Sequence, residues 1–341
     1  MNTFSLLVLY GLDERSSALE VTSTVKLICN VTQALVAEGW RVLPLQVSHD
    51  LVTQLRRFDP AEWIVINLCE GEPQQDFYYS QAAHILEEMG FTYTGSSAWT
   101  LEETQYKWRM KTLLEVGDVP TPPWAVFERA EDVVFDHFPA IVKPGASHCS
   151  YGITRNSVVL NLEEAREQVA RIINTFRQPA IIEKFLDSPE YNVAIWGNQC
   201  AELLGISTMQ YDYFADIRDR LCTFEAKWVP ESVAYQHIPV VCPAPISAEL
   251  YEHIMEAALA AYRITGCRDY GRVDLRLDGD KPMVLDVNAN CDISPEGGFA
   301  HTAAAAGIRY GEMLNRIVEF SLARSSRIQT RGYQNTIVEA V

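Results

Sequence analysis

The residues from 271 to 288 read Gly271-Arg-Val-Asp-Leu-Arg-Leu-Asp-Gly-Asp-Lys-Pro-Met-Val-Leu-Asp-Val-Asn288. Two runs that alternate apolar and polar residues flank Asp278-Gly279-Asp280-Lys281, and Asp-Gly between such runs is a strong turn signal. The stretch therefore predicts a β-hairpin. Symmetric pairing of its strands about Asp280 places Asp274 opposite Asp286 and Arg272 opposite Asn288.

Side chains alternate between the two faces of a strand, so this hairpin has an apolar face and a charged face. Directly opposed like charges destabilise a strand pair, so two facing aspartates need a compensating cation. Carboxylate and amide oxygens suit Mg²⁺, which predicts a metal site, while the alternative is a solvated outer face. The apolar face comprises Val273, Leu275, Leu277, Met283, Leu285 and Val287; the charged face comprises Arg272, Asp274, Arg276, Asp286 and Asn288.

Length and composition indicate a soluble globular protein of two or three domains. The chain has 341 residues, of which 48% are hydrophobic and 21% charged, and its formal charge is −17. This acidic balance argues against binding to nucleic acid or to an anionic membrane. There is no apolar run of membrane-spanning length and no basic region before the apolar start, so neither a span nor a signal peptide is expected. The eight cysteines are scattered without a CxxC pair, which favours reduced thiols in a cytoplasmic protein.

The first part of the chain alternates strands and helices. Strands are predicted at 4–10, 41–47, 63–67 and 91–94, and helices at 20–38 and 81–89. This rhythm indicates a parallel sheet covered by helices, with ligands beyond the carboxyl ends of the strands. We assign residues 1–98 to an N-terminal α/β substrate domain.

Two α+β subdomains and a tail are predicted to follow. Residues 99–186 contain a helix at 101–116, the extended Val119–Pro123 connector, strands at 140–143 and 180–183, and a helix at 162–175. Residues 187–325 contain long strands, a helix at 247–265, the hairpin and a helix at 301–323. Residues 326–341 show no clear period and are predicted to be a tail.

Two further segments have the composition of nucleotide contacts. The loop Gly145–Gly152 follows a strand that ends near Lys143, and its small residues would let backbone N–H groups cradle a phosphate, although a plain surface turn is the alternative. It lacks the GxxxxGK[ST] spacing of a Walker loop. Phe185 and Leu186, at a strand exit, are suited to adenine, and Glu190 to ribose, the alternative being a buried strand that ends in a Ser-Pro turn. Taken singly, Lys107 and Lys227 read as surface lysines.

In this order along the chain, these segments resemble the ATP-grasp superfamily, and more narrowly its D-alanine–D-alanine ligase branch. The resemblance covers nearly the whole chain. It also includes the segments Ile66–Gly71, Phe91–Ser96, Val119–Pro122 and Ala303–Gly307. It implies an ATP-grasp fold, in which an N-terminal parallel α/β domain precedes two α+β subdomains that clamp ATP.

The resemblance also implies roles for individual residues. Catalysis is assigned to Arg272, which would stabilise an acyl phosphate and a tetrahedral intermediate, and to Ser150. Metal binding, by two Mg²⁺ ions or by Mn²⁺ in their place, is assigned to Asp274, Asp286 and Asn288. ATP binding is assigned to Lys107, Lys143 and Lys227 at the phosphates, to Ser147, Ser150 and Gly152 in the loop over them, to Glu183, Lys184, Phe185 and Leu186 at adenine, and to Glu190 at ribose.

The chain departs from that branch where the acceptor substrate is expected. Cys291-Asp292-Ile293 stands in place of Pro-Gly-Met, and Gly297-Gly298 in place of Ser-Leu; Asp286 stands in place of a Glu. The added carboxylate of Asp292 would suit a cationic or hydroxylated amine. The predicted substrate contacts are Glu20, Glu70, Arg272, Asp292 and Gly297.

These features predict an ATP-dependent carboxylate–amine ligase that acts through an acyl phosphate and releases ADP and phosphate. Phosphorylation turns a carboxylate, a poor electrophile, into a group that an amine can attack, and cations stabilise the charge on the phosphoryl oxygens. The small-molecule substrates are expected to be amino-acid-like but not two D-alanines. The alternatives are a genuine D-alanine–D-alanine ligase of cell-wall synthesis and a non-catalytic nucleotide-binding relative. A homodimer is an option that the resemblance leaves open.

Overall fold

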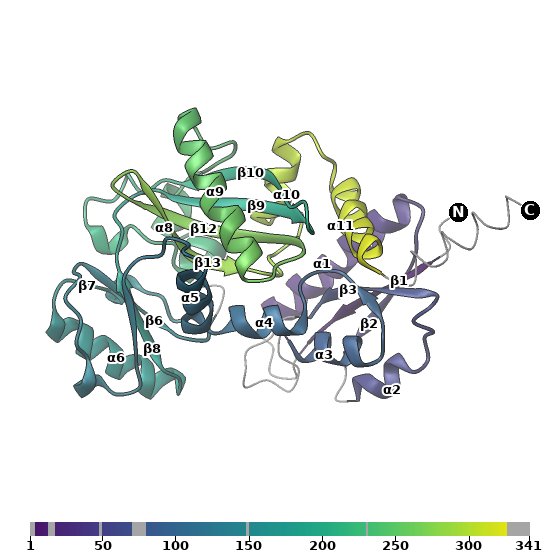
Figure 1. Ribbon diagram of the computed structural model, residues 1–341, viewed down its shortest axis with the longest axis horizontal. Coiled ribbons are helices and arrows are strands. Elements are labelled where there is room, and N and C mark those ends of the chain that lie inside the picture. The colour runs from purple at the N-terminus through teal and green to yellow at the C-terminus, as the bar shows by residue number, and fades with distance from the viewer. Residues whose placement is uncertain are drawn as a thin grey trace, which may run out of the picture.

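The computed structural model describes residues 4–12, 18–47, 50–69, 80–147, 150–229 and 231–325. In these ranges the strands form three sheets: the first lies in one half of the molecule, and the second and third lie in the other half, one below the other in Figure 1. The predicted tail at 326–341 and the predicted substrate residue Glu70 lie outside the described residues. Within the described ranges, none of the helices combines the length and the apolar character needed to cross a bilayer.

The first sheet is parallel, as predicted. Its strand order is β2-β1-β3-β4, from Arg41–Gln46, Ser5–Tyr10, Trp63–Leu68 and Thr92–Tyr93. Alternate residues of β1 pack in opposite directions, because Leu6 and Val8 meet helix α1 (Ala18–Ala37) while Leu7 and Leu9 share a core with α2 (Leu51–Leu55) and α3 (Gln81–Glu88).

The second sheet belongs to the central subdomain and is antiparallel. Its order is β5-β8-β6-β7, from Trp124–Phe127, Ala180–Lys184, Ala140–Pro144 and Val158–Val159. Helix α6 (Leu162–Phe176) covers one face and buries Val169 and Ile172 against it. Short turns η1 (Ala130–Asp132) and η2 (Arg155–Ser157) complete this unit.

The third sheet is antiparallel and contains the hairpin. Its order is β11-β10-β9-β12-β13, from Val240–Val241, Glu202–Met209, Glu190–Gly197, Asp269–Asp278 and Lys281–Asn288. Helix α9 (Ala248–Ile264) packs on β12 and β13, and α10 (Gly298–Ala305) and α11 (Tyr310–Arg324) follow the hairpin. The segment between β10 and β11 carries η3 (Ile217–Asp219), α7 (Phe224–Trp228) and α8 (Val233–His237).

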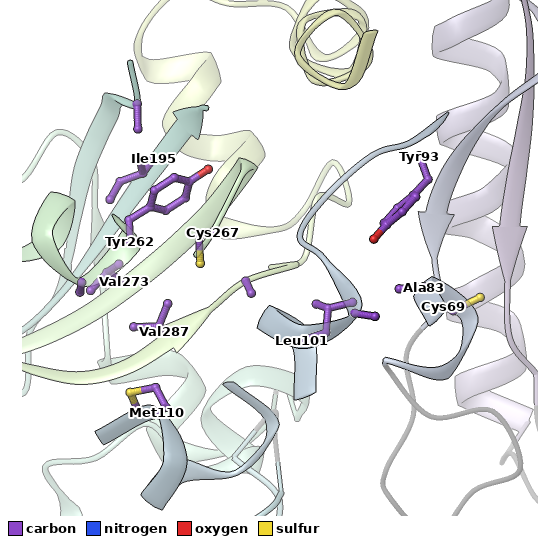
Figure 2. Close-up of a cluster of buried hydrophobic side chains, with 14 of the residues drawn as sticks. Cys69, Ala83, Tyr93, Leu101, Met110, Ile195, Tyr262, Cys267, Val273 and Val287 are labelled. Atoms are coloured by element: carbon purple, nitrogen blue, oxygen red, sulfur yellow. The ribbon is translucent and has the colours of Figure 1, made fainter. Parts of the chain in front are cut away.

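One continuous core joins the first sheet to the third. Figure 2 shows Tyr262, Val273 and Val287 of the third subdomain, then Met110 and Leu101, and then Ala83 and Tyr93 of the first domain. Leu101 and Met110 come from α4 (Ala98–Gln105) and α5 (Lys107–Val116), so these two helices fill the space between the domains.

Two helices predicted as single elements are each divided. The predicted helix at 101–116 breaks at Tyr106, whose φ of −97° and ψ of 111° are extended. The break lets the Lys107 amide donate to Gly145 O at 2.8 Å, so a tertiary contact overrides helix propensity. The predicted helix at 301–323 is divided into α10 and α11, and Gly307 adopts φ +81° between them.

Polar contacts tie the first domain to the segment that follows β13. Asp269 is fully buried, and both of its oxygens accept from Arg324, at 2.8 and 2.6 Å, while the Gly95 amide donates to Oδ2 at 2.9 Å. The Ser96 amide donates to Asn290 Oδ1 at 2.9 Å. The Ser96 contact holds Asn290, at the start of the loop in which the predicted acceptor residues lie.

Candidate active site

The hairpin has the register that the sequence predicts around its charged residues. β12 and β13 are antiparallel, with Arg272 opposite Asn288 and Asp274 opposite Asp286. The four polar side chains therefore share one face of the sheet, which is the face directed at the central subdomain's β6 and β8 across a cavity.

The apolar face of the second strand differs from the predicted one because the strand contains a β-bulge. The register shifts after Asp274, so that Leu275 faces Val284 and Leu285 becomes the extra residue. Val284 consequently lies in the core, whereas Leu285 lines the cavity with the charged residues. Met283 pairs with Arg276 of the charged face. The placement of Met283 and Leu285 on the apolar face was therefore wrong.

A single cavity gathers most of the predicted nucleotide and metal residues. It lies between the second and third sheets, and Gly152 is the one predicted member of this set that does not line it. The predicted residues that do line it are Lys107, Lys143, Ser147, Ser150, Glu183, Lys184, Phe185, Leu186, Glu190, Lys227, Arg272, Asp274, Asp286 and Asn288.

Asp274 lines this cavity and accepts four hydrogen bonds from neighbouring side chains. Arg272 donates to it twice, from Nε at 2.7 Å and from Nη2 at 2.9 Å. Asn192 and Asn288 each donate from Nδ2 at 2.9 Å. Burial disfavours the charged guanidinium, but the adjacent Asp274 outweighs it and raises the pKa of Arg272 above its ordinary value. Arg272 is therefore a fixed cation beside the carboxylates.

The cation that pairs with Asp286 is Lys107 rather than Arg272. Lys107 Nζ donates to Asp286 Oδ2 at 2.7 Å from the first residue of α5. Burial lowers the pKa of Lys107, but Asp286 and the neighbouring Glu183 and Asp274 reverse the effect, so that the pKa is raised. In the structure, Arg272 and Lys107 thus offset the repulsion between the two aspartates.

The chemistry of these donors fits a hard divalent cation. Asp274, Asp286 and Asn288 offer only oxygen, because the Asn288 amide nitrogen already faces Asp274 and leaves Oδ1 as the donor. No group of three or more His, Cys, Asp or Glu side chains in the described ranges is placed to hold a metal. An ion here would therefore take its remaining ligands from phosphate oxygens and water.

Glu183 lies in a buried network that includes a lysine missed by the sequence reading. Glu183 and Lys111 are each 1% exposed, and Lys111 Nζ lies 2.7 Å from Glu183 Oε2. Lys143 donates to the other carboxylate oxygen, and Lys111 also donates to Thr121 Oγ1 at 2.7 Å. Burial raises the carboxyl pKa, but the two lysines outweigh it and lower the pKa of Glu183 to about 2. Lys107 and Lys111 are four residues apart and so lie on one face of a helix, and this spacing is the signal that could have revealed the network.

The small-residue loop after β6 is fixed by glutamines from neighbouring elements. Gln105 donates to Ala146 O at 2.8 Å, and Gln178 donates to Ser147 Oγ at 2.9 Å. Ser150 has φ +61°, and Gly152 has φ +78°. A Cβ on Gly152 would lie 2.7 Å from Pro144 and 2.8 Å from Phe176, so its role is to close the loop tightly. Residues 148 and 149 lie outside the described ranges.

The end of β8 and the segment after it supply part of the apolar surface of the cavity. Phe185 and Leu186 line the cavity and are 5% and 4% exposed. Lys184 also lines it, and its Nζ donates to both oxygens of Asp278 at the hairpin turn, at 2.9 and 2.7 Å. Lys227, from α7, lines the same cavity.

A second, smaller cavity lies beside the loop after β13. It is lined by Leu27, Asn67, Leu68, Cys69, Tyr270, Asn290, Cys291, Asp292 and Ile293. Tyr270 belongs to β12, and residues 290–293 directly follow β13, so this cavity lies at one end of the hairpin. The predicted substrate residue Asp292 is exposed, and both of its oxygens accept from Ser294, at 2.7 and 3.0 Å.

Gly297 is shaped by Asp292. A Cβ on Gly297 would lie 2.8 Å from Asp292 Oδ2 and 3.0 Å from Asp292 O. The two predicted substrate residues therefore touch one another. Glu20 belongs to α1, but its side chain is outside the described part of the chain.

Comparison with known proteins identifies the family. A family model described as D-ala D-ala ligase C-terminus matches residues 113–319, which is more than half of the chain. The chain belongs to the D-alanine–D-alanine ligase family. One relative of this chain is the Sinorhizobium fredii protein named "Uncharacterized protein y4sG". It is 31% identical to this chain over 303 residues, which covers 86% of this chain and 87% of the relative. A protein named D-alanine–D-alanine ligase, from Desulforudis audaxviator, is 26% identical over 305 residues and covers 86% and 92% of the two chains.

The fold is shared with a solved member of the D-alanine–D-alanine ligase family. The crystal structure of D-alanine–D-alanine ligase from Bacillus anthracis complexed with ATP superposes with a TM-score of 0.74 at 21% identity, over 95% of this chain and 99% of that one. The predicted family, the ATP-grasp fold and the enzyme class, an ATP-grasp ligase, are therefore confirmed.

Proposed function

We propose that the protein is an ATP-dependent carboxylate–amine ligase whose substrates are amino-acid-like but are not two D-alanines. The observation that carries this proposal is the contrast between two neighbouring sites. One cavity holds Arg272, the lysines and the acidic residues of a phosphoryl-transfer site, while the adjoining loop from Ala289 to Gly297 has its own internal contacts.

The first cavity has complementary parts for each portion of ATP. Lys107, Lys143 and Lys227 bring positive charge to the phosphates, and Ser147 and Ser150 lie in the loop over them. Phe185, Leu186 and Leu285 offer apolar surface to the base, and Glu190 offers an acceptor to the ribose. Asp274, Asp286 and Asn288 would hold Mg²⁺, or Mn²⁺ in its place, which when bound neutralises phosphate charge.

The position of Arg272 suits it to stabilise the acyl transfer. Asp274 occupies its Nε and Nη2, and in the described ranges no side chain or carbonyl is recorded at Nη1. An N–H group held in this position stabilises negative charge that develops next to it. Such charge develops on the acyl phosphate and on the oxyanion that forms when the amine attacks. ADP and phosphate are the products, and the new bond is an amide.

The acceptor side supports substrates other than two D-alanines. Asp292 fills the space beside Gly297, so a serine at 297, the residue expected by resemblance to the D-alanine–D-alanine ligase branch, would collide with the Asp292 carboxylate. Loss of that hydroxyl removes one donor for a second substrate's carboxylate. The second cavity is then free to recognise a different acceptor.

A coupled assay of ADP release tests the proposal. Carboxylates are crossed with amines, with D-alanine included on both sides, and kcat/KM is measured for each pair. The expected result is ADP release that requires both partners and is faster with a pair other than D-alanine with D-alanine. Arg272→Ala should remove turnover but retain ATP binding, whereas the matched control Arg316→Ala, on the exposed side of α11, should change neither.

The second candidate, a D-alanine–D-alanine ligase of cell-wall synthesis, is favoured by the name of the Desulforudis audaxviator relative. A strong preference for the D-alanine pair would establish it and refute the first proposal. A protein that binds ATP but turns over no pair would be the non-catalytic relative instead.

A further inference from the structure

Arg276 is a buried cation of the first cavity that the predicted site did not include. It lies two residues after Asp274 on β12, on the same face of the sheet, and is 3% exposed. A buried charge is costly unless it is paired and hydrogen-bonded. The contacts of Arg276 therefore indicate what it positions.

Three donors of Arg276 reach three different elements. Nη1 donates to Leu186 O at 2.9 Å, in the segment after β8. Nη2 donates to Arg220 O at 2.9 Å, just after η3. Nε donates to Glu190 Oε2 at 3.3 Å, at the start of β9. The guanidinium spreads its donors over three nitrogens and so reaches acceptors on three elements, whereas the three N–H groups of a lysine ammonium all radiate from one atom.

Two aromatic rings pack against the guanidinium of Arg276. Its carbon lies 5.2 Å from the Phe185 ring centroid and 4.6 Å from the Tyr211 ring centroid. Tyr211 also donates from its hydroxyl to Glu190 Oε2 at 3.5 Å. Arg276 is therefore locked in place, and the position of the Glu190 carboxylate is fixed with it.

The two donors that reach Glu190 leave one of its oxygens available. Arg276 and Tyr211 both use Oε2, and within the described ranges no donor is recorded at Oε1. A carboxylate anchored through one oxygen presents the other, in a fixed orientation, to a pair of adjacent hydroxyl groups. Adjacent hydroxyls of this kind belong to a ribose and are absent from a 2′-deoxyribose.

We propose that Arg276 is a positioning residue that sets selectivity for a ribonucleotide over a 2′-deoxyribonucleotide, by fixing Glu190 for the ribose and the Leu186 peptide for the base. The inference rests on the ATP-binding half of the proposed function. It does not depend on which carboxylate and amine the enzyme joins.

Calorimetric titration of the full chain with ATP and with 2′-deoxy-ATP, each with Mg²⁺ and without other substrates, tests this role. Wild-type protein should bind ATP more tightly than 2′-deoxy-ATP by about tenfold or more, the usual effect of a hydrogen bond to a charged group. Arg276→Met should lower this ratio to about one and weaken ATP binding by about tenfold. Arg276→Lys, which keeps the charge but not the fork, should not restore the ratio.

Two further variants separate positioning from loss of structure. Glu190→Gln should lower the ratio of the two affinities as Arg276→Met does. The double variant Arg276→Met with Glu190→Gln should lose no more of the preference for ATP than either single variant, because both residues act through the same hydroxyl contact. Arg316→Met is the matched control and should retain the wild-type ratio. If Arg276→Met does not fold, Arg276→Lys and Glu190→Gln decide the outcome.

Three results would overturn the inference. If Arg276→Met, or a folded Arg276→Lys, retains the wild-type preference for ATP over 2′-deoxy-ATP, Arg276 does not position the ribose acceptor. If wild-type protein binds ATP and 2′-deoxy-ATP equally, there is no selectivity to set, although ATP binding stands. If it binds neither nucleotide, the proposed function fails first and this role fails with it.

Discussion

Replacing Glu183 with glutamine should cost the protein far more stability than removal of an ordinary surface charge. Glu183 and Lys111 are each 1% exposed and 2.7 Å apart, so Glu183→Gln leaves a buried lysine without its counter-charge. Breaking a buried pair from one side costs about 3–5 kcal/mol. Lys111 and Lys143 lower the pKa of Glu183 to about 2, which is the direction expected of a carboxylate that is stabilised by folding.

The same pKa gives the prediction a pH dependence with a definite sign. A carboxyl whose pKa is depressed by folding adds stability above its unfolded value, and this stability is lost as pH falls through the folded value. The wild-type advantage over Glu183→Gln should therefore be complete at pH 7 and should shrink between about pH 4.5 and pH 2.

Urea denaturation followed by tryptophan fluorescence measures the effect as a free energy of unfolding. Lys111→Met should partly rescue Glu183→Gln, since it removes the stranded cation. The control Glu319→Gln, whose ion pair with Arg316 is half exposed, should change the free energy by less than about 0.5 kcal/mol. Equal stability of Glu183→Gln and wild type at pH 7, or no rescue by Lys111→Met, would refute the reasoning.

Three further substitutions test other parts of the structure. Gly152→Ala should lower the free energy of unfolding by about 1–3 kcal/mol and raise the KM for ATP, because its Cβ meets Pro144 and Phe176, whereas Gly279→Ala, with open space around it, should cost about 1 kcal/mol in the same denaturation experiment. Gly297→Ser should lower the melting temperature on its own but be tolerated together with Asp292→Gly; equal melting temperatures for both variants would contradict the contact between 292 and 297. Gly95→Ala, whose Cβ would lie 2.4 Å from Asn290 Oδ1 at φ +90°, should destabilise by about 2 kcal/mol and slow ADP release, and a neutral result would remove the role given to this interdomain contact.

Sequence patterns predicted those features that depend on neighbours along the chain. The Asp-Gly turn and the alternation around it predicted the pairing of Asp274 with Asp286, and the strand–helix rhythm predicted the parallel first sheet. The order of the charged segments predicted a set of residues most of which line one cavity.

Features that depend on contacts between distant segments were not predictable. The run Leu285-Asp286-Val287 alternates regularly, so nothing in it marks a bulge. Tyr106 carries no helix-breaking chemistry, and the break there depends on the carbonyl of Gly145. The spacing of Lys107 and Lys111 indicates a shared helix face, but the sequence does not show that Glu183 will be buried beside Lys111, nor that Arg276 will pair with Glu190.

The bulge at Leu285 has a consequence for how this site can vary. Neighbouring residues of a regular strand face opposite ways, yet here Leu285 and Asp286 both border the first cavity. One peptide unit thus joins the apolar surface that we propose for a base with the carboxylate that opposes Asp274. A substitution that shifts one residue moves the other, so under the proposed function base preference and metal geometry should change together under selection rather than separately.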